Sequence, residues 1–308
     1  MAPVRIQGAA YNPDPRWVCA SAPSLAVLSD RLAVWPQYLL PKRALTRAAG
    51  RLASAHAGAL TQTLIRAFIR HYDVAMHEAA EPDPAAYTSF NDFFTRALRP
   101  GARPLAADGL LCPVDGAISQ FGALQGEQML QAKGHHYRVQ DLLGGDAKLA
   151  ATFRDGQFAT IYLSPRDYHR IHMPEAARLR RMIFVPGALF SVNPRTARGV
   201  PGLFARNERV VCVFDSDTGP WCLVLVGATI VGSMATIWHG IVSGAKAGSA
   251  CEWSYENDSV ALSRGAEMGR FLLGSTVVLV WPGQALRFDS TWAPGAAVRM
   301  GSLMAERA

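Results

Sequence analysis

A run of β-branched and large apolar residues, 277–281, directly follows Gly274, Ser275 and Thr276. Such a run predicts a buried strand, so we expect the Gly-Ser pair in a tight turn anchored to rigid structure. The Ser275 hydroxyl can then attack the Gly274 carbonyl, because glycine has no side chain to block the approach. The resulting ester can break by β-elimination, which splits the chain after Gly274 and leaves a pyruvoyl group at residue 275.

The Gly-Ser pair alone is weak evidence, because other such pairs occur at 232–233, 248–249 and 301–302 and most are ordinary turns. A reactive serine also needs a base to accept its proton and a carboxylate to orient that base. Asp115 in a Pro/Gly-bounded turn, and His172 after a predicted strand, are the candidates for these roles. Each also has an ordinary interpretation, Asp115 as a turn residue and His172 as a half-buried imidazole.

The composition argues against several other kinds of site. His169 and His172 have His-x-x-His spacing but no evident third ligand, so no metal is expected. The five cysteines are odd in number and form no Cys-x-x-Cys pair, which argues against a disulfide scaffold and for a reducing compartment. The net charge of +7 favours acidic partners, but the absence of RNA-binding signatures and dense Lys/Arg tracts disfavours nucleic acid. Neither a transmembrane helix nor a signal peptide is expected.

The chain divides into an irregular extension (1–35), a helical region (36–100) and a β-rich catalytic domain (101–308). The predicted fold class is therefore α+β, with a mostly antiparallel β domain after a helical, membrane-associating N-terminal region. Short apolar runs predict the strands, and a helix is expected around 141–153. The predicted strands are 158–163, 210–214, 223–226, 228–231 and 277–281.

Residues 31–71 contain seven Lys or Arg and no acidic residue. Arg43, Arg47 and Arg51 recur every four residues and predict a basic stripe on a helix that begins near Pro41. A second amphipathic helix is expected around 60–70, and Ser89 predicts the capped start of a third. The helix pair can lie on an anionic membrane or pack on the core with a solvated basic face. The absence of acids favours the membrane.

Three stretches in fixed order resemble the bacterial, pyruvoyl-dependent phosphatidylserine decarboxylases: Pro113-Val114-Asp115-Gly116, residues 162–174 and residues 273–276. The resemblance begins near residue 36 and runs almost to the end of the chain, while residues 1–35 have no counterpart. The linking stretches that also resemble the family are 38–47, 131–135, 185–187, 190–193, 203–209 and 227–233.

The resemblance implies that Asp115, His172 and Ser275 form a self-processing relay and that cleavage falls between Gly274 and Ser275. Residues 1–274 and 275–308 would then form a heterodimer of large and small chains, with further homo-oligomerisation left open. Ser275 would become the covalent pyruvoyl cofactor, which decarboxylates phosphatidylserine to phosphatidylethanolamine through a Schiff base. His169 would position the substrate carboxylate or transfer a proton.

The implied partners are phosphatidylserine in the bilayer and an anionic membrane surface. The implied location is peripheral, on the cytoplasmic face of the bacterial inner membrane. Three alternatives stay open: a serine hydrolase that does not cleave itself, a non-catalytic membrane-binding homologue, and a pyruvoyl decarboxylase of a soluble amino acid. The sequence has no Gly-x-Ser-x-Gly elbow at Ser275, which argues against the hydrolase. Pyridoxal phosphate bound through Lys133 is disfavoured, because nothing else around that residue suggests a phosphate cradle.

Overall fold

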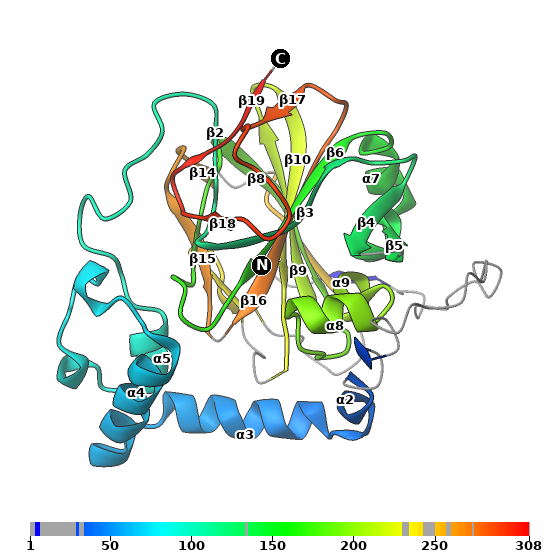
Figure 1. The fold of residues 1–308 in the computed structure, drawn as a ribbon. Helices are drawn as coiled ribbons and strands as arrows, with labels where there is room; N and C mark the ends of the chain where they lie inside the picture. The colour runs from blue at the N-terminus through cyan, green and yellow to red at the C-terminus, as the bar shows by residue number, and fades with distance from the viewer. Residues whose placement is uncertain are drawn as a thin grey trace.

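The computed structural model describes residues 4–6, 29–30, 34–132, 135–229, 234–242, 250–256, 260–272 and 274–307. Among these residues the largest element is an antiparallel ten-stranded sheet, in the order β1-β13-β8-β9-β10-β16-β6-β3-β18, with β14 paired to β8 (Figure 1). Its strands are β1 Val4–Ile6, β3 Gly116–Ala123, β6 Gln157–Leu163, β8 Ala177–Val185, β9 Arg209–Ser216, β10 Gly219–Val226, β13 Ala250–Ser254, β14 Ala261–Leu262, β16 Ser275–Trp281 and β18 Ala297–Val298.

Strand β16 lies inside this sheet, between β10 and β6. Its side chains alternate between two hydrophobic cores: Val277, Leu279 and Trp281 belong to one, and Val278 and Val280 belong to the other. A strand covered on both faces needs apolar residues at every position, which explains why the run is continuous instead of alternating.

The first core lies between the large sheet and two smaller sheets, with strand orders β12-β11-β15-β7 and β17-β19-β2. The second lies beneath the β4-β5 hairpin and four short helices. The elements are β2 Leu110–Leu111, β4 Gln128–Ala132, β5 His135–Arg138, β7 Arg170–His172, β11 Met234–Thr236, β12 Gly240–Val242, β15 Glu267–Phe271, β17 Leu286–Phe288, β19 Leu303–Arg307, α6 Val139–Leu142, α7 Ala147–Thr152, α8 Pro194–Gly199 and α9 Leu203–Arg206.

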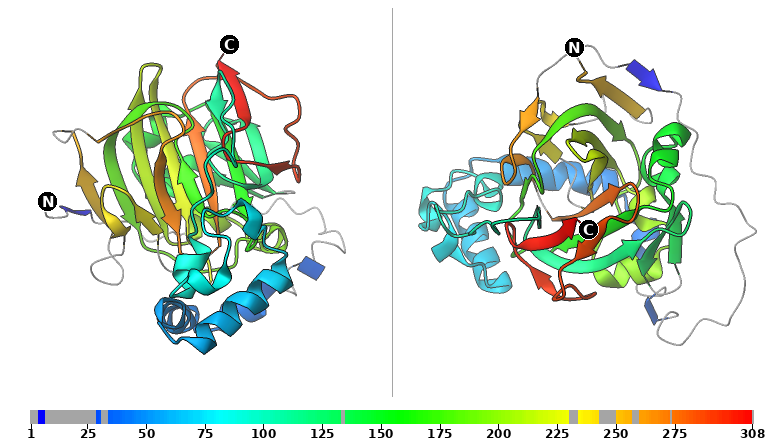
Figure 2. Two further views of the ribbon diagram at one scale, coloured as in Figure 1. Left: turned by 90° about the vertical axis from the view of Figure 1, so that its left-hand side faces the viewer. Right: turned by 90° about the horizontal axis from the view of Figure 1, so that it is seen from above.

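The N-terminal helices gather at one end of the molecule, beneath the large sheet (Figures 1 and 2). Helix α3 begins at Lys42, directly after Pro41, as predicted. The Oγ atom of Ser89 accepts a hydrogen bond from the Asp92 backbone N at 3.1 Å, which confirms the predicted cap of α5. No described helix is both long enough and apolar enough to cross a membrane. The elements are α2 Pro36–Leu39, α3 Lys42–Ser54, α4 Ala59–Tyr72, the 3-10 helices Met76–Glu78 and Pro84–Ala86, and α5 Phe90–Phe94.

The predicted α+β class and four of the five predicted strands are confirmed, the latter in β6, β9, β10 and β16. The fifth prediction, 228–231, is wrong for residues 228 and 229, which lie outside any strand, and residues 230 and 231 lie outside the described residues. The predicted helix at 141–153 is two helices, because Gly144 and Gly145 between α6 and α7 have φ values of 83° and 93°. Leu273, Lys133 and most of residues 1–35 also lie outside the described residues.

Candidate active site

Ser275 is the first residue of β16 and pairs with Leu163 at the end of β6. Its side chain is completely buried, and its Oγ atom has no hydrogen-bond partner in the described part of the chain. Burying a hydroxyl without a partner is costly, so such groups are rare in folded proteins and call for an explanation. Ser275 therefore combines a rigid backbone with a hydroxyl that makes no hydrogen bond to the described residues.

Gly274 has room for a side chain. A methyl group added there would lie 3.7 Å from the Leu163 carbonyl oxygen and 3.8 Å from Nε2 of His169, both ordinary van der Waals distances. Packing in this structure therefore does not require glycine at 274. The remaining argument for glycine is the chemical one, that the carbonyl carbon stays open to attack.

His169 lies beside this glycine and is fully buried. Its Nδ1 donates to the Asp167 carbonyl oxygen at 2.8 Å, and its Nε2 has no partner among the described residues. The ring of Phe94, at the end of α5, lies 4.1 Å from the imidazole between centroids. Burial lowers the pKa of His169 to about 3, so the ring is neutral near pH 7 and Nε2 carries a free lone pair.

The turn that carries His169 is closed by Asp167. Its Oδ2 accepts from the Ser164 backbone N at 2.6 Å, and its own backbone N donates to the Ser164 carbonyl at 3.0 Å. Burial raises the pKa of Asp167, and the hydrogen bonds from Ser164 oppose this shift. Asp167 thus fixes the backbone carbonyl that orients His169.

His172, at the end of β7, is half-buried and both of its ring nitrogens have partners. Nδ1 donates to the Gly265 carbonyl at 2.8 Å, which leaves Nε2 to accept from the Tyr168 hydroxyl at 3.0 Å. Burial lowers the pKa of His172, and the hydrogen bond to Gly265 opposes this shift. His172 is in the neutral form that a base needs, but the lone pair on its Nε2 already accepts a hydrogen bond from Tyr168.

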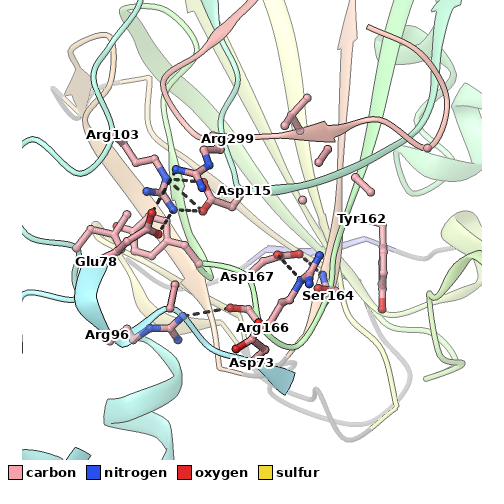
Figure 3. A pocket seen from close by; sticks show the side chains of 18 of the residues that line it. Asp73, Glu78, Arg96, Arg103, Asp115, Tyr162, Ser164, Arg166, Asp167 and Arg299 are labelled. Carbon is pink, nitrogen blue, oxygen red and sulfur yellow. Dashed lines mark hydrogen bonds and ion pairs between the residues drawn. The ribbon is translucent and has the colours of Figure 1, made fainter. Parts of the chain in front are cut away.

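Asp115 is buried and held as part of an ion-pair cluster (Figure 3). Arg103 donates to it through Nε at 3.0 Å and through Nη2 at 2.5 Å, and the Met300 backbone N donates at 2.8 Å. Arg103 also donates to Glu78 at 2.7 Å. Such a two-point contact fixes the carboxylate rigidly.

No hydrogen bond joins Asp115, His172 and Ser275, all three of which the structure describes. The turn of Asp115 does touch the strand of His172, because the His172 backbone N donates to the Pro113 carbonyl at 2.9 Å. The relay stays a prediction: in this uncleaved chain it would need His172 to exchange its Tyr168 contact for one with Ser275.

A cavity of about 520 Å³ opens beside Asp115, Asp167 and Tyr168, whereas Ser275, His169 and His172 are not among the described residues that line it. The residues after β6 line one side of it, and charged residues from distant segments line the other (Figure 3). Sequence analysis did not identify the charged ones, because their contacts join positions far apart in the chain, such as Arg299 and Glu78. In the described ranges no group of three or more His, Cys, Asp or Glu is placed to hold a metal ion. The charged cavity residues that the sequence did not point to are Glu78, Arg96, Arg103 and Arg299.

Comparison with known proteins gives consistent matches. Residues 90–306 match the family described as phosphatidylserine decarboxylase, and residues 32–73 match a second family described as PSD. A protein from Delftia acidovorans, named phosphatidylserine decarboxylase proenzyme, is 66% identical over 281 residues, which is 91% of this chain and 99% of the relative. Proteins of the same name from Albidiferax ferrireducens and Dechloromonas aromatica are 65% and 62% identical, over 90% and 91% of this chain and 98% and 100% of their own lengths.

Proposed function

The chain belongs to the phosphatidylserine decarboxylase family, and from this premise we propose that it cleaves itself between Gly274 and Ser275 and then converts phosphatidylserine to phosphatidylethanolamine. One observation carries the proposal. The unpartnered hydroxyl of Ser275 adjoins Gly274, and the unpartnered Nε2 of His169 lies beside the same glycine. The name proenzyme, which the relatives bear, fits a protein that is cleaved to mature.

The surroundings of Ser275 fit a covalent pyruvoyl group made from this residue. The group would sit at the start of an interior strand, in a buried position that excludes water, and the Ser275 hydroxyl has no hydrogen bond to a described residue that would be lost. Such a group supplies a ketone that condenses with the substrate amine and withdraws electrons as carbon dioxide leaves.

The small chain, residues 275–308, would stay bound to the large chain as a heterodimer. Its strand β16 has a large-chain neighbour on each side, β10 and β6. Its β18 pairs with β3 and its β19 pairs with β2. The hydrogen bond from Met300 N to Asp115 crosses the same boundary. Cutting one peptide bond at the start of β16 leaves all of these contacts intact.

The residue roles follow from the contacts. We assign Asp115 and His172 to the relay that activates Ser275. In this relay His172 exchanges its hydrogen bond with Tyr168 for one with Ser275. We assign His169 to the substrate, because its neutral Nε2 is an acceptor that no group of the described residues occupies. Nε2 would take the proton that the substrate ammonium must lose before its amine attacks the ketone, and would return it to the substrate carbon after carbon dioxide leaves.

The helical N-terminal region is the proposed membrane-binding surface. Apolar side chains on α2–α4 face solvent, and Leu39, Leu60 and Leu52 are 69%, 62% and 53% exposed. The arginines of the predicted stripe on α3 are also exposed. Exposed apolar residues next to arginines suit the interface of an anionic bilayer, where the substrate lies. This supports peripheral attachment to a membrane surface, and we propose the cytoplasmic face of the inner membrane as that surface.

The test is the intact mass of the denatured wild-type protein, with Ser275→Ala as control. We expect two fragments split after Gly274, the small one lighter than its serine form by one ammonia, and a single uncleaved Ser275→Ala chain. A single wild-type chain would refute the self-cleavage and return the choice to a hydrolase or a non-catalytic homologue. Assays of the cleaved protein with phosphatidylserine vesicles and with free serine then separate the lipid from a soluble amino acid as substrate.

A further inference from the structure

Arg96 is a buried cation in the wall of the cavity, two residues beyond the end of α5. Its exposed fraction is only 5%. Nη2 donates to the Arg166 carbonyl at 3.2 Å (Figure 3), and the guanidinium lies 5.5 Å from the Phe93 ring centroid. Nε and Nη1 have no hydrogen-bond partner among the described residues. A buried charge with unpaired donors is costly, so such a group suggests a ligand.

The other three arginines that line the cavity each have a carboxylate partner among the residues described. Among the described cavity arginines, Arg96 alone forms no direct ion pair with a described carboxylate. Burial lowers the pKa of its guanidinium, but arginine stays charged at any physiological pH. The pairs are Arg103 with Asp115 at 2.5 Å and with Glu78 at 2.7 Å, Arg299 with Glu78 at 3.2 Å, and Arg166 with Asp167 at 3.9 Å.

Arg96 is also linked to the predicted cleavage site through its own segment. Phe94 packs on the imidazole of His169, whose Nε2 lies beside Gly274. The Thr95 carbonyl accepts from Nε of Arg170 at 2.8 Å, which fixes this segment against β7. The side chain of Arg96 therefore lines the cavity from a rigid position close to the proposed reaction centre.

We propose that Arg96 binds the phosphodiester of the phosphatidylserine headgroup and so contributes to the affinity for the lipid. This inference rests on the proposed function. Arginine is well suited to phosphate oxygens because its planar N–H donors match their geometry. In phosphatidylserine the phosphodiester is only a few bonds from the reacting amine, so a phosphodiester held in the cavity leaves the amine a short reach to residue 275, which does not itself line the cavity.

The headgroup carries a second anion, the carboxylate that is lost, but it is the less suitable partner. Decarboxylation removes the negative charge of that group, so an ion pair with Arg96 would stabilise the ground state more than the transition state and slow the reaction. The phosphodiester keeps its charge throughout. An ion pair with it strengthens binding equally in both states and leaves the chemical step unaffected.

The test uses the uncleaved Ser275→Ala chain, so that binding is measured without any turnover. Two soluble ligands are titrated by calorimetry: glycerophosphoethanolamine, which has the phosphodiester and no carboxylate, and O-methylserine, which has the carboxylate and no phosphate. Each is measured with Arg96→Gln, Arg96→Lys and a control, Arg154→Gln, whose arginine is 67% exposed and does not line the cavity. Thermal unfolding checks that each variant is folded.

We expect Arg96→Gln to weaken glycerophosphoethanolamine binding about tenfold or more, Arg96→Lys to weaken it less, and O-methylserine binding to change little. In the cleaved enzyme, Arg96→Gln should raise KM for phosphatidylserine more than it lowers kcat. A loss confined to O-methylserine, an equal loss for both ligands, or no binding of glycerophosphoethanolamine to the parent chain would each overturn the proposal. A wild-type chain that never cleaves would instead refute the proposed function, while the binding result would stand.

Discussion

The Tyr168 hydroxyl donates a hydrogen bond to Nε2 of His172 at 3.0 Å, so the imidazole that the family resemblance assigns to Ser275 is occupied by a neighbour four residues away. Nδ1 is fixed by the Gly265 carbonyl, and only Nε2 can accept a proton. Activation of Ser275 through His172 therefore requires this one contact to open, which makes the Tyr168–His172 hydrogen bond a candidate control point for maturation.

Replacing Tyr168 with Phe tests that relationship. Removing the hydroxyl leaves Nε2 of His172 free, and a hydrogen bond of about 1 kcal/mol no longer has to break, so self-cleavage should become faster, by about fivefold. The measurement is the rate at which newly synthesised chain splits, followed by gel or mass spectrometry. Slower cleavage in this variant would mean that the Tyr168 hydroxyl itself takes part in the reaction.

Gly274→Ala separates packing from chemistry at the cleavage site. Apart from its chain neighbours, the described residues come no closer than 3.7 Å to the added methyl group, so the variant should fold with an unchanged thermal midpoint. Its cleavage should nevertheless be slower, because the methyl group crowds the carbonyl that Ser275 attacks. A variant that cleaves at the wild-type rate would remove the steric argument for glycine. Ser275→Ala, measured in parallel, marks complete loss of cleavage.

His169→Ala should allow cleavage and reduce turnover, whereas Asp115→Ala and His172→Ala should impair cleavage itself. Removing a group that transfers protons costs about a hundredfold or more in rate. Fragment masses report on cleavage, and the release of carbon dioxide from phosphatidylserine vesicles reports on turnover. Full decarboxylation by cleaved His169→Ala protein would exclude His169 from the mechanism.

The pH dependence of folding stability should carry the signature of His169. Its pKa is about 3 in the folded chain against about 6.5 when unfolded, so between these values only the unfolded state takes up the proton. Stability is therefore lost as pH falls through this window, by about 2 kcal/mol at pH 5. Denaturant unfolding of Ser275→Ala, with and without His169→Gln, isolates this contribution. Identical pH slopes in the two proteins would contradict it.

Arg103 should be required for stability. Its side chain and that of Asp115 are 5% and 10% exposed, so Arg103→Met leaves the buried Asp115 carboxylate without its cation and should cost about 3 kcal/mol. Glu78 keeps its ion pair with Arg299. The matched control is Arg180→Met, because Arg180 and Asp215 form an exposed pair whose loss should cost less than about 1 kcal/mol. Denaturant unfolding of both variants in the Ser275→Ala background measures the difference. Equal losses would show that burial of the Arg103 pair is unimportant.

The sequence by itself determined the local elements. The apolar run at 277–281 predicted a buried strand, Pro41 and Ser89 placed the starts of two helices, and the order of three short motifs indicated the family. These features follow from near-neighbour chemistry, such as side-chain periodicity, fixed backbone angles and capping, which is readable along the chain. The candidate residues Asp115, His169, His172 and Ser275 came from the same motifs.

Only the tertiary structure decided what each candidate touches. Asp115 contacts Arg103 and Met300 instead of His172, and His169 is the histidine beside Gly274. Arg96 resembles any other arginine in the sequence, because its burial and its carbonyl partner depend on a segment 70 residues away. Burial and hydrogen-bond pairing depend on how distant segments pack, and spacing along one chain does not encode them.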